Sequence, residues 1–184
     1  TGCLRIREAF TWGNDTERLI LKIIEHIPGN MSATEADICA LETTLNARLP
    51  DSYRAFLIRA NGGRPSPATF SFVEDGRETS STIQCFYACS ADAVFGILPT
   101  LQCYARRIPM GFVPIGCDGL GNVLLLCTLA NDRGSVWFWD HEKEHVRRNS
   151  SNIIRIADGF EDLCQSLHDI ERTGRRSAEQ CPAE

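Results

Sequence analysis

The sequence predicts an α+β fold in which helices pack on a mostly antiparallel sheet. Between residues 15 and 60, apolar residues recur at helical spacing. From residue 69 to residue 139 they form strand-like runs joined by short turns rich in Gly, Asn and Asp. A helical period returns after residue 159. This order of helices, strand meander and closing helix is typical of α+β domains.

Three helices are expected before the first strand. The first spans Asp15–His26, where Leu and Ile form an i, i+3, i+4 stripe. The second begins at a capping box with Ser32 as N-cap and Glu35 at N3, and ends before Pro50. The third follows Pro50 and ends at Asn61-Gly62-Gly63, which tolerate the positive φ of a helix C-cap. Its buried side is expected to carry Tyr53, Phe56 and Leu57.

The second half of the chain alternates strand signals with turn signals. A helix interrupted near Pro99 is expected over Ala91–Arg106, and a closing helix over Gly159–Thr173. Turns are expected at 74–77, 117–122 and 131–134. The expected strands are Thr69–Val73, Thr82–Tyr87, Phe112–Ile115, Asn122–Leu129, Ser135–Trp139 and Asn152–Ile156.

Length and composition indicate one domain in a reducing compartment. The chain has 184 residues, of which 43% are hydrophobic, and its net charge of -5 argues against a general nucleic-acid binder. Its nine cysteines are odd in number and contain no C-x-x-C pair, so Cys127 and Cys164 are interpreted as reduced core residues. No apolar run reaches the ~18 residues of a membrane span. The first residues, interrupted by Arg5 and Arg7, do not resemble a signal peptide. A cytoplasmic protein is expected.

One catalytic motif is present, and its context argues against it. His141, Glu142 and His145 match the H-E-x-x-H pattern, in which two histidines on one face of a helix bind zinc and the glutamate acts as general base. Here the motif follows the apolar run Val136–Trp139 and no third histidine ligand comes after it. We interpret it as a charged loop after a strand, and keep a zinc hydrolase as the weakest functional alternative.

Two further patterns give no catalytic set. The loop Asp118–Asn122 lacks the lysine of a phosphate-binding loop and the ligand spacing of an EF-hand, so a tight turn is expected. Cys85 and Cys89 have a spacing uncommon for zinc or redox sites, and a nucleophilic cysteine needs a histidine beside it. We therefore expect no catalytic residue, no metal and no cofactor.

The remaining candidates are binding residues. Trp139 belongs to a run of three aromatics, which is interpreted either as a strand buried on both sides or as one face presenting an aromatic to a partner. Acidic residues gather in the predicted turns, where they form either a solvated rim or a face for a basic partner. The candidate binding residues are Asp75, Glu78, Asp118, Trp139, Asp140 and Glu142.

Several short motifs, in order, resemble the SUKH superfamily of Smi/Knr-like domains. The first is a helix followed by Leu49-Pro50, Tyr53, Phe56-Leu57 and Asn61-Gly62-Gly63. The second is the block Val113-Pro114-Ile115, Asp118-Gly119, Gly121-Asn122 and Val136–Asp140. The third is Ile156-Ala157-Asp158 leading into Phe160–Leu163. The resemblance covers residues 32–168, leaving an N-terminal extension with a helix at 1–31 and a helix end with a polar tail at 169–184.

The resemblance implies a strongly bent central sheet and a binding function. Most bacterial members are similar to immunity proteins that neutralise a secreted toxin, as in contact-dependent inhibition, by stoichiometric occlusion. The implied partner is a cognate protein toxin, such as a nuclease, and not a nucleic acid or a membrane; the protein is expected to be a monomer or weak dimer. The alternative is a non-catalytic regulatory or scaffold module of the Smi/Knr type.

Overall fold

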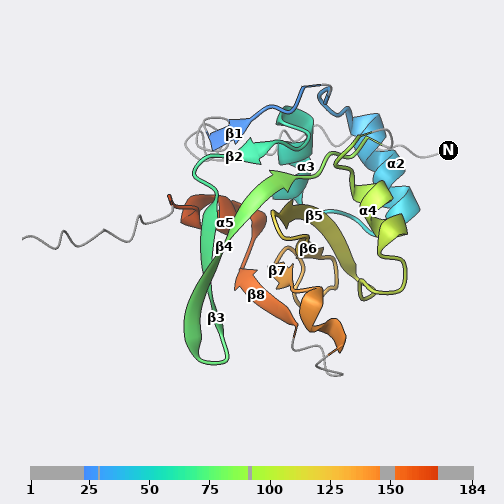
Figure 1. The fold of residues 1–184 in the computed structure, drawn as a ribbon. Coiled ribbons are helices and arrows are strands. Elements are labelled where there is room, and N and C mark those ends of the chain that lie inside the picture. The colour runs from blue at the N-terminus through green and yellow to red at the C-terminus, as the bar shows by residue number, and fades with distance from the viewer. Residues whose placement is uncertain (1–22, 29, 91–92, 146–151, 170–184) are drawn as a thin grey trace, which may run out of the picture.

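The computed structural model describes residues 23–28, 30–90, 93–145 and 152–169 (Figure 1). They form an α+β fold with a six-stranded antiparallel sheet and a small two-stranded sheet. The helices are α2 (Glu35–Leu45), α3 (Asp51–Arg59), α4 (Ile97–Cys103), the 3₁₀ helix η1 (Glu142–His145) and α5 (Phe160–Ser166). The strands are β1 (Ile24–Glu25), β2 (Arg64–Pro65), β3 (Thr69–Glu74), β4 (Arg77–Phe86), β5 (Phe112–Asp118), β6 (Val123–Cys127), β7 (Val136–Trp139) and β8 (Ile153–Ala157).

The main sheet is a meander that curls until its edges meet. Its strand order is β3-β4-β5-β6-β7-β8, so each strand pairs with its neighbour in sequence. In a flat sheet with strands about 4.8 Å apart, the two edges would lie roughly 24 Å from each other. Instead β3 contacts β8, and the ring centroids of Phe70 and Phe138 are 5.5 Å apart. The predicted bent, mostly antiparallel sheet with packed helices is therefore confirmed.

Helix α3 forms as its sequence pattern predicts and anchors the core. Tyr53, Phe56 and Leu57 are buried. The ring centroid of Phe56 lies 4.7 Å from that of Phe160 in α5 and 5.5 Å from that of Phe86 in β4. Burying each of these side chains contributes about 1.5–3 kcal/mol of hydrophobic stabilisation.

The chain leaves α3 through the predicted turn at Asn61, Gly62 and Gly63. These residues have φ values of 46°, 87° and 134°. At Gly62 a Cβ would lie 2.9 Å from the carbonyl oxygen of Phe86, so this position needs glycine both for its conformation and for the close approach of β4.

The capping box of α2 lies two residues later than predicted. Thr34, not Ser32, is the N-cap: its hydroxyl accepts a hydrogen bond from the Asp37 amide at 3.2 Å, and the Asp37 carboxylate accepts one from the Thr34 amide at 2.8 Å. The sequence S-A-T-E-A-D contains two overlapping boxes, and both satisfy the spacing rule. The reciprocal hydrogen bonds decide between them.

Three other helix boundaries differ from the prediction. The first helix was expected to reach His26, but Ile24–Glu25 is a strand that pairs with β2; residues 15–22 lie outside the described part. Helix α4 begins only at Ile97, and Pro99 lies within its first turn, where a missing N–H costs nothing. Helix α5 ends at Ser166 because the backbone of His168 exchanges two hydrogen bonds with Thr69 at the edge of β3.

The described cysteines are reduced and mostly internal, as expected for Cys127 and Cys164, which are both buried. Among the described residues, no helix is long and apolar enough to cross a membrane.

Candidate functional site

A lysine joins two acidic segments that are far apart in sequence. Lys143 Nζ lies 2.6 and 2.7 Å from the two carboxylate oxygens of Glu74 at the end of β3, and 3.0 Å from Asp140 Oδ2 after β7. The hydrogen bond to Glu74 is the main cause that raises the pKa of Lys143, so the ammonium group stays charged. We call the surface formed by Glu74, Asp75, Asp140, Glu142 and Lys143 the acidic rim.

Local turn geometry presents the outer carboxylates of the acidic rim. Asp75 and Gly76 both have positive φ, 50° and 76°, as in the two-residue turns that suit the twist of a hairpin. Asp140 Oδ1 accepts hydrogen bonds from the amides of Glu142 and Lys143, at 3.1 and 3.4 Å, and so begins η1. Asp75 and Glu142 are exposed as a result.

Glu78 lies on the other face of the same hairpin. Residues directly opposite each other in an antiparallel pair share a face, and Glu78 is opposite Val73, whereas Glu74 is opposite Arg77. Val73 is 64% exposed, and Glu78 is also exposed. The structure therefore brings Asp75, Asp140 and Glu142 to one rim and directs Glu78 away from Lys143.

Two predicted binding residues are buried and cannot contact a partner in this conformation. Asp118 is 2% exposed, and its carboxylate accepts hydrogen bonds from the amides of Leu120 and Asn122 at 2.9 Å each. It also accepts from the side chains of Asn122 and Ser81, at 2.9 and 3.0 Å. Its position in a turn suggested exposure, but the turn folds back over the carboxylate. We therefore assign Asp118 to holding the turn.

Trp139 is 1% exposed, because Tyr104 packs against it edge-on at 5.1 Å and the Arg107 guanidinium lies 5.2 Å from its ring centroid. The strand interpretation of the aromatic run fits this burial, since Phe138 is buried on the opposite face. Only Trp137 is partly exposed, beside Phe112.

The H-E-x-x-H motif does not form the helix that a zinc hydrolase needs. Glu142–His145 is one 3₁₀ turn, and His141 precedes it with its Nδ1 atom 2.9 Å from Asn122 Oδ1. Within the described residues, no three His, Cys, Asp or Glu side chains are grouped so that they could hold a metal ion. The segment follows β7 as expected, but it forms a short 3₁₀ helix where a loop was expected.

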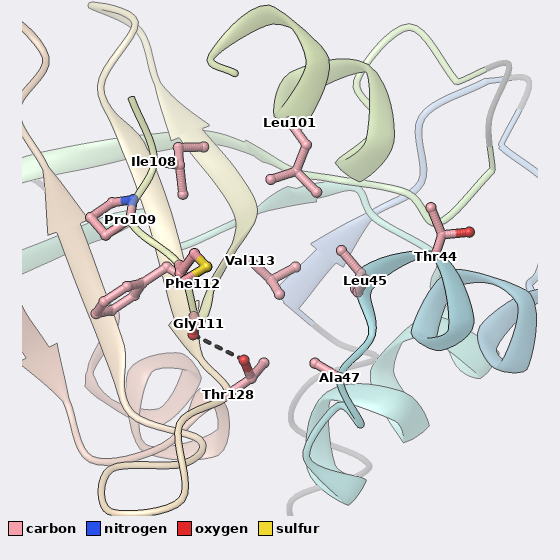
Figure 2. A pocket seen from close by; sticks show the side chains of 11 residues that line it. Thr44, Leu45, Ala47, Leu101, Ile108, Pro109, Gly111, Phe112, Val113 and Thr128 are labelled. Atoms are coloured by element: carbon pink, nitrogen blue, oxygen red, sulfur yellow. Dashed lines mark hydrogen bonds between the residues drawn. The ribbon is translucent and has the colours of Figure 1, made fainter. Parts of the chain in front are cut away.

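A second surface, which the sequence did not predict, lies at the opposite end of β5 and β7. Figure 2 shows a groove between the C-terminal end of α2, the loop before β5 and the turn after β6. Two adjoining depressions, with cavity volumes of about 300 and 430 Å³, form it. They share Leu45, Ala47, Met110, Gly111 and Thr128.

The groove is apolar at its centre and cationic at one end. Met110 is 93% exposed and Leu129 is 51% exposed, so two large apolar side chains face solvent beside it. Arg48 and Arg133 line the outer depression, and no described lining residue is a carboxylate. The only sequence signal was Met110 itself, an apolar residue in the turn-like segment Pro109-Met110-Gly111.

Comparison with known proteins identifies a family model and a related protein that resemble this chain. A model of the SMI1 / KNR4 family (SUKH-1) matches residues 32–166. The chain is 26% identical over 152 residues to a protein described as "SPbeta prophage-derived uncharacterized protein YokK" of Bacillus subtilis (strain 168), with 74% of this chain and 75% of that protein covered.

Proposed function

Because the chain belongs to the SMI1/KNR4 family (SUKH-1), we propose that it is an immunity protein that binds a cognate secreted bacterial toxin in the cytoplasm and neutralises it by stoichiometric occlusion. The observation that carries the proposal is the acidic rim, which is assembled from the β3–β4 hairpin and the segment after β7. The description of the B. subtilis relative as prophage-derived supports it, because a toxin gene that moves between genomes must move together with the gene for its antidote.

The chemistry of the acidic rim fits a basic toxin surface. A toxin that cleaves nucleic acid needs Lys and Arg around its active site to bind phosphates. Asp75 and Glu142 are exposed on one rim, and Glu74 and Asp140 lie beside them around Lys143. The exposed carboxylates can enter a basic cleft in place of phosphates, and the complementary charge speeds and orients association. Occlusion then needs no catalytic step by this protein.

The test is co-expression with the toxin domain encoded beside the gene, scored by bacterial survival and by a co-purifying 1:1 complex. We expect Glu142→Lys, combined with Asp75→Lys, to weaken the complex by roughly 10-fold or more, and most strongly at low salt. Asp158→Lys is the matched control, because Asp158 is 83% exposed but lies in the loop between β8 and α5. Survival that is unaffected by the wild-type chain would overturn the immunity function. An equal loss of affinity in the Asp75→Lys/Glu142→Lys variant and in Asp158→Lys would overturn the assignment of the acidic rim as the binding surface.

A regulatory or scaffold module of the Smi/Knr type is the second candidate, and the groove favours it. An extended acidic segment with one large apolar side chain would match Met110, Leu129 and the two arginines. Under this function, Met110→Glu abolishes capture of the cellular partner, whereas Leu120→Glu, on another largely exposed apolar residue in the turn before β6, does not. Partner capture unchanged by Met110→Glu would remove the support from the groove.

A further inference from the structure

Two cysteines face each other across neighbouring strands inside the sheet. Cys85 of β4 is the direct antiparallel partner of Cys117 of β5, and their Sγ atoms lie 3.8 Å apart. Opposed residues of an antiparallel pair have Cα separations of about 4.5–5.5 Å, which lie within the range that a disulfide spans. Small rotations about the two Cα–Cβ bonds would therefore bring the sulfurs to bonding distance without moving the strands.

We propose that Cys85 and Cys117 form an oxidation site, at which a hydroperoxide converts the dithiol into an intramolecular disulfide. The peroxide oxygen is transferred to the sulfur of Cys117, which becomes a sulfenic acid, and the O–O bond breaks to release hydroxide, or an alkoxide from an organic hydroperoxide. That anion takes up the proton that the Cys117 thiol had lost and becomes water or an alcohol. The sulfur of Cys85 then attacks that of Cys117, and the S–O bond breaks to release water. The protein loses two electrons and two protons, and one peroxide is reduced.

The surroundings give the two thiols different roles. Cys117 is 7% exposed, whereas Cys85 is fully buried. Hydrogen bonding from Cys85, and then from Tyr87, lowers the pKa of the Cys117 thiol and so favours its thiolate form. Hydrogen bonding to Cys117 and burial raise the pKa of Cys85, which stays protonated until Cys117 has reacted. The more exposed cysteine is therefore also the more nucleophilic one.

The disulfide would lie at the base of the β3–β4 hairpin. The pairing of β4 with β5 shifts register between Ile83 and Cys85, at the point where the hairpin leaves the sheet. Cys117 also precedes Asp118, whose carboxylate bonds to Ser81 of the same hairpin. Oxidation would thus fix the base of the hairpin that carries half of the acidic rim.

The test uses the full chain, purified under reducing conditions and treated with hydrogen peroxide. Free thiols are blocked, and the digest is searched by mass spectrometry for a Cys85–Cys117 linked peptide that has lost two hydrogen masses. We expect this link in the folded protein and a fall in the unfolding equilibrium constant of roughly two to three orders of magnitude, from closing a loop of about 30 residues. Cys127→Ser is the matched control, since Cys127 is a buried residue of β6, and it should leave the link intact.

Single variants separate the two roles. Cys85→Ser should leave a sulfenic acid on Cys117 that dimedone traps, whereas Cys117→Ser should leave Cys85 unoxidised. If either variant fails to fold, Tyr87→Phe still tests the mechanism, because loss of its hydrogen bond should slow oxidation of Cys117 several-fold. Peroxide treatment that yields no Cys85–Cys117 link, or links Cys117 to another cysteine, would overturn the proposal.

Discussion

Replacing Asp118 with alanine removes the acceptor that holds the turn between β5 and β6 together. The carboxylate accepts four hydrogen bonds, two of them from the backbone and side chain of Asn122, which is 8% exposed. In the variant, the amide of exposed Leu120 and the hydroxyl of half-buried Ser81 can hydrogen-bond to water instead. The backbone and side-chain donors of Asn122 cannot, because Asn122 is buried. A buried donor left without an acceptor costs roughly 1.5–2.5 kcal/mol, and the variant leaves two of them. We therefore expect Asp118→Ala to lower the free energy of unfolding by about 3–5 kcal/mol.

Asp118→Asn should lower the free energy of unfolding by about half as much as Asp118→Ala. The amide keeps the oxygen that accepts from the two backbone N–H groups, and puts an NH₂ group where the other oxygen accepted from Asn122 Nδ2 and Ser81. Only the contact with Asn122 Nδ2 becomes donor against donor, because the Ser81 hydroxyl can rotate to accept. The ranking wild type, Asp118→Asn, Asp118→Ala therefore follows from the geometry alone.

Equilibrium urea unfolding, followed by far-UV circular dichroism and tryptophan fluorescence, measures this ranking. The denaturant slope should not change, and Leu120→Ala should stay within about 0.5 kcal/mol of wild type because Leu120 is 78% exposed. A cost below about 1 kcal/mol for Asp118→Ala would refute our account of the turn. If that stable variant also failed to bind the partner, the result would instead support direct contact between Asp118 and the partner.

Three further predictions concern stability. Gly62→Ala should cost about 2 kcal/mol more than Gly76→Ala, because both positions have positive φ but only at Gly62 would a Cβ meet backbone, the Phe86 carbonyl oxygen at 2.9 Å. Tyr53 has a buried hydroxyl without a hydrogen-bond partner, so Tyr53→Phe should stabilise the protein by up to about 1–2 kcal/mol. Burial raises the pKa of Tyr53 above 10.0, so Tyr53→Phe should also remove a loss of about 1.4 kcal/mol per pH unit above pH 10. Lys143→Met should cost about 1 kcal/mol or less, and less still in high salt, since Lys143 is 35% exposed.

Each of these predictions has a result that contradicts it. Equal costs at the two glycines would mean that the strand yields to the added methyl group. Destabilisation by Tyr53→Phe would mean that its hydroxyl has a partner such as a buried water. The direction of the pH effect follows from the raised pKa: the phenol is neutral in both states below pH 10, and only the unfolded chain ionises above it. A cost of Lys143→Met that is independent of salt would point to packing by its alkyl chain instead of charge.

Local pattern in the sequence determined helix α3, the turn that follows it and the family. The spacing of Tyr53, Phe56 and Leu57 placed them on one buried face, and the run Asn61-Gly62-Gly63 marked the turn after it, because period and permitted φ are properties of neighbouring residues. The same local signals could not choose between two overlapping capping boxes. They also could not show that the closing helix stops where His168 joins the edge of β3.

Only the tertiary structure decided which residues meet and which are buried. Lys143 reaches Glu74 across 69 positions of sequence, and Cys85 faces Cys117 across 32, through strand register and the curl of the sheet. Asp118 had the composition of an exposed turn, yet the turn closes over it. Turn composition reports permitted backbone angles, whereas exposure depends on which distant atoms pack against the turn, and that is fixed only when the sheet has closed.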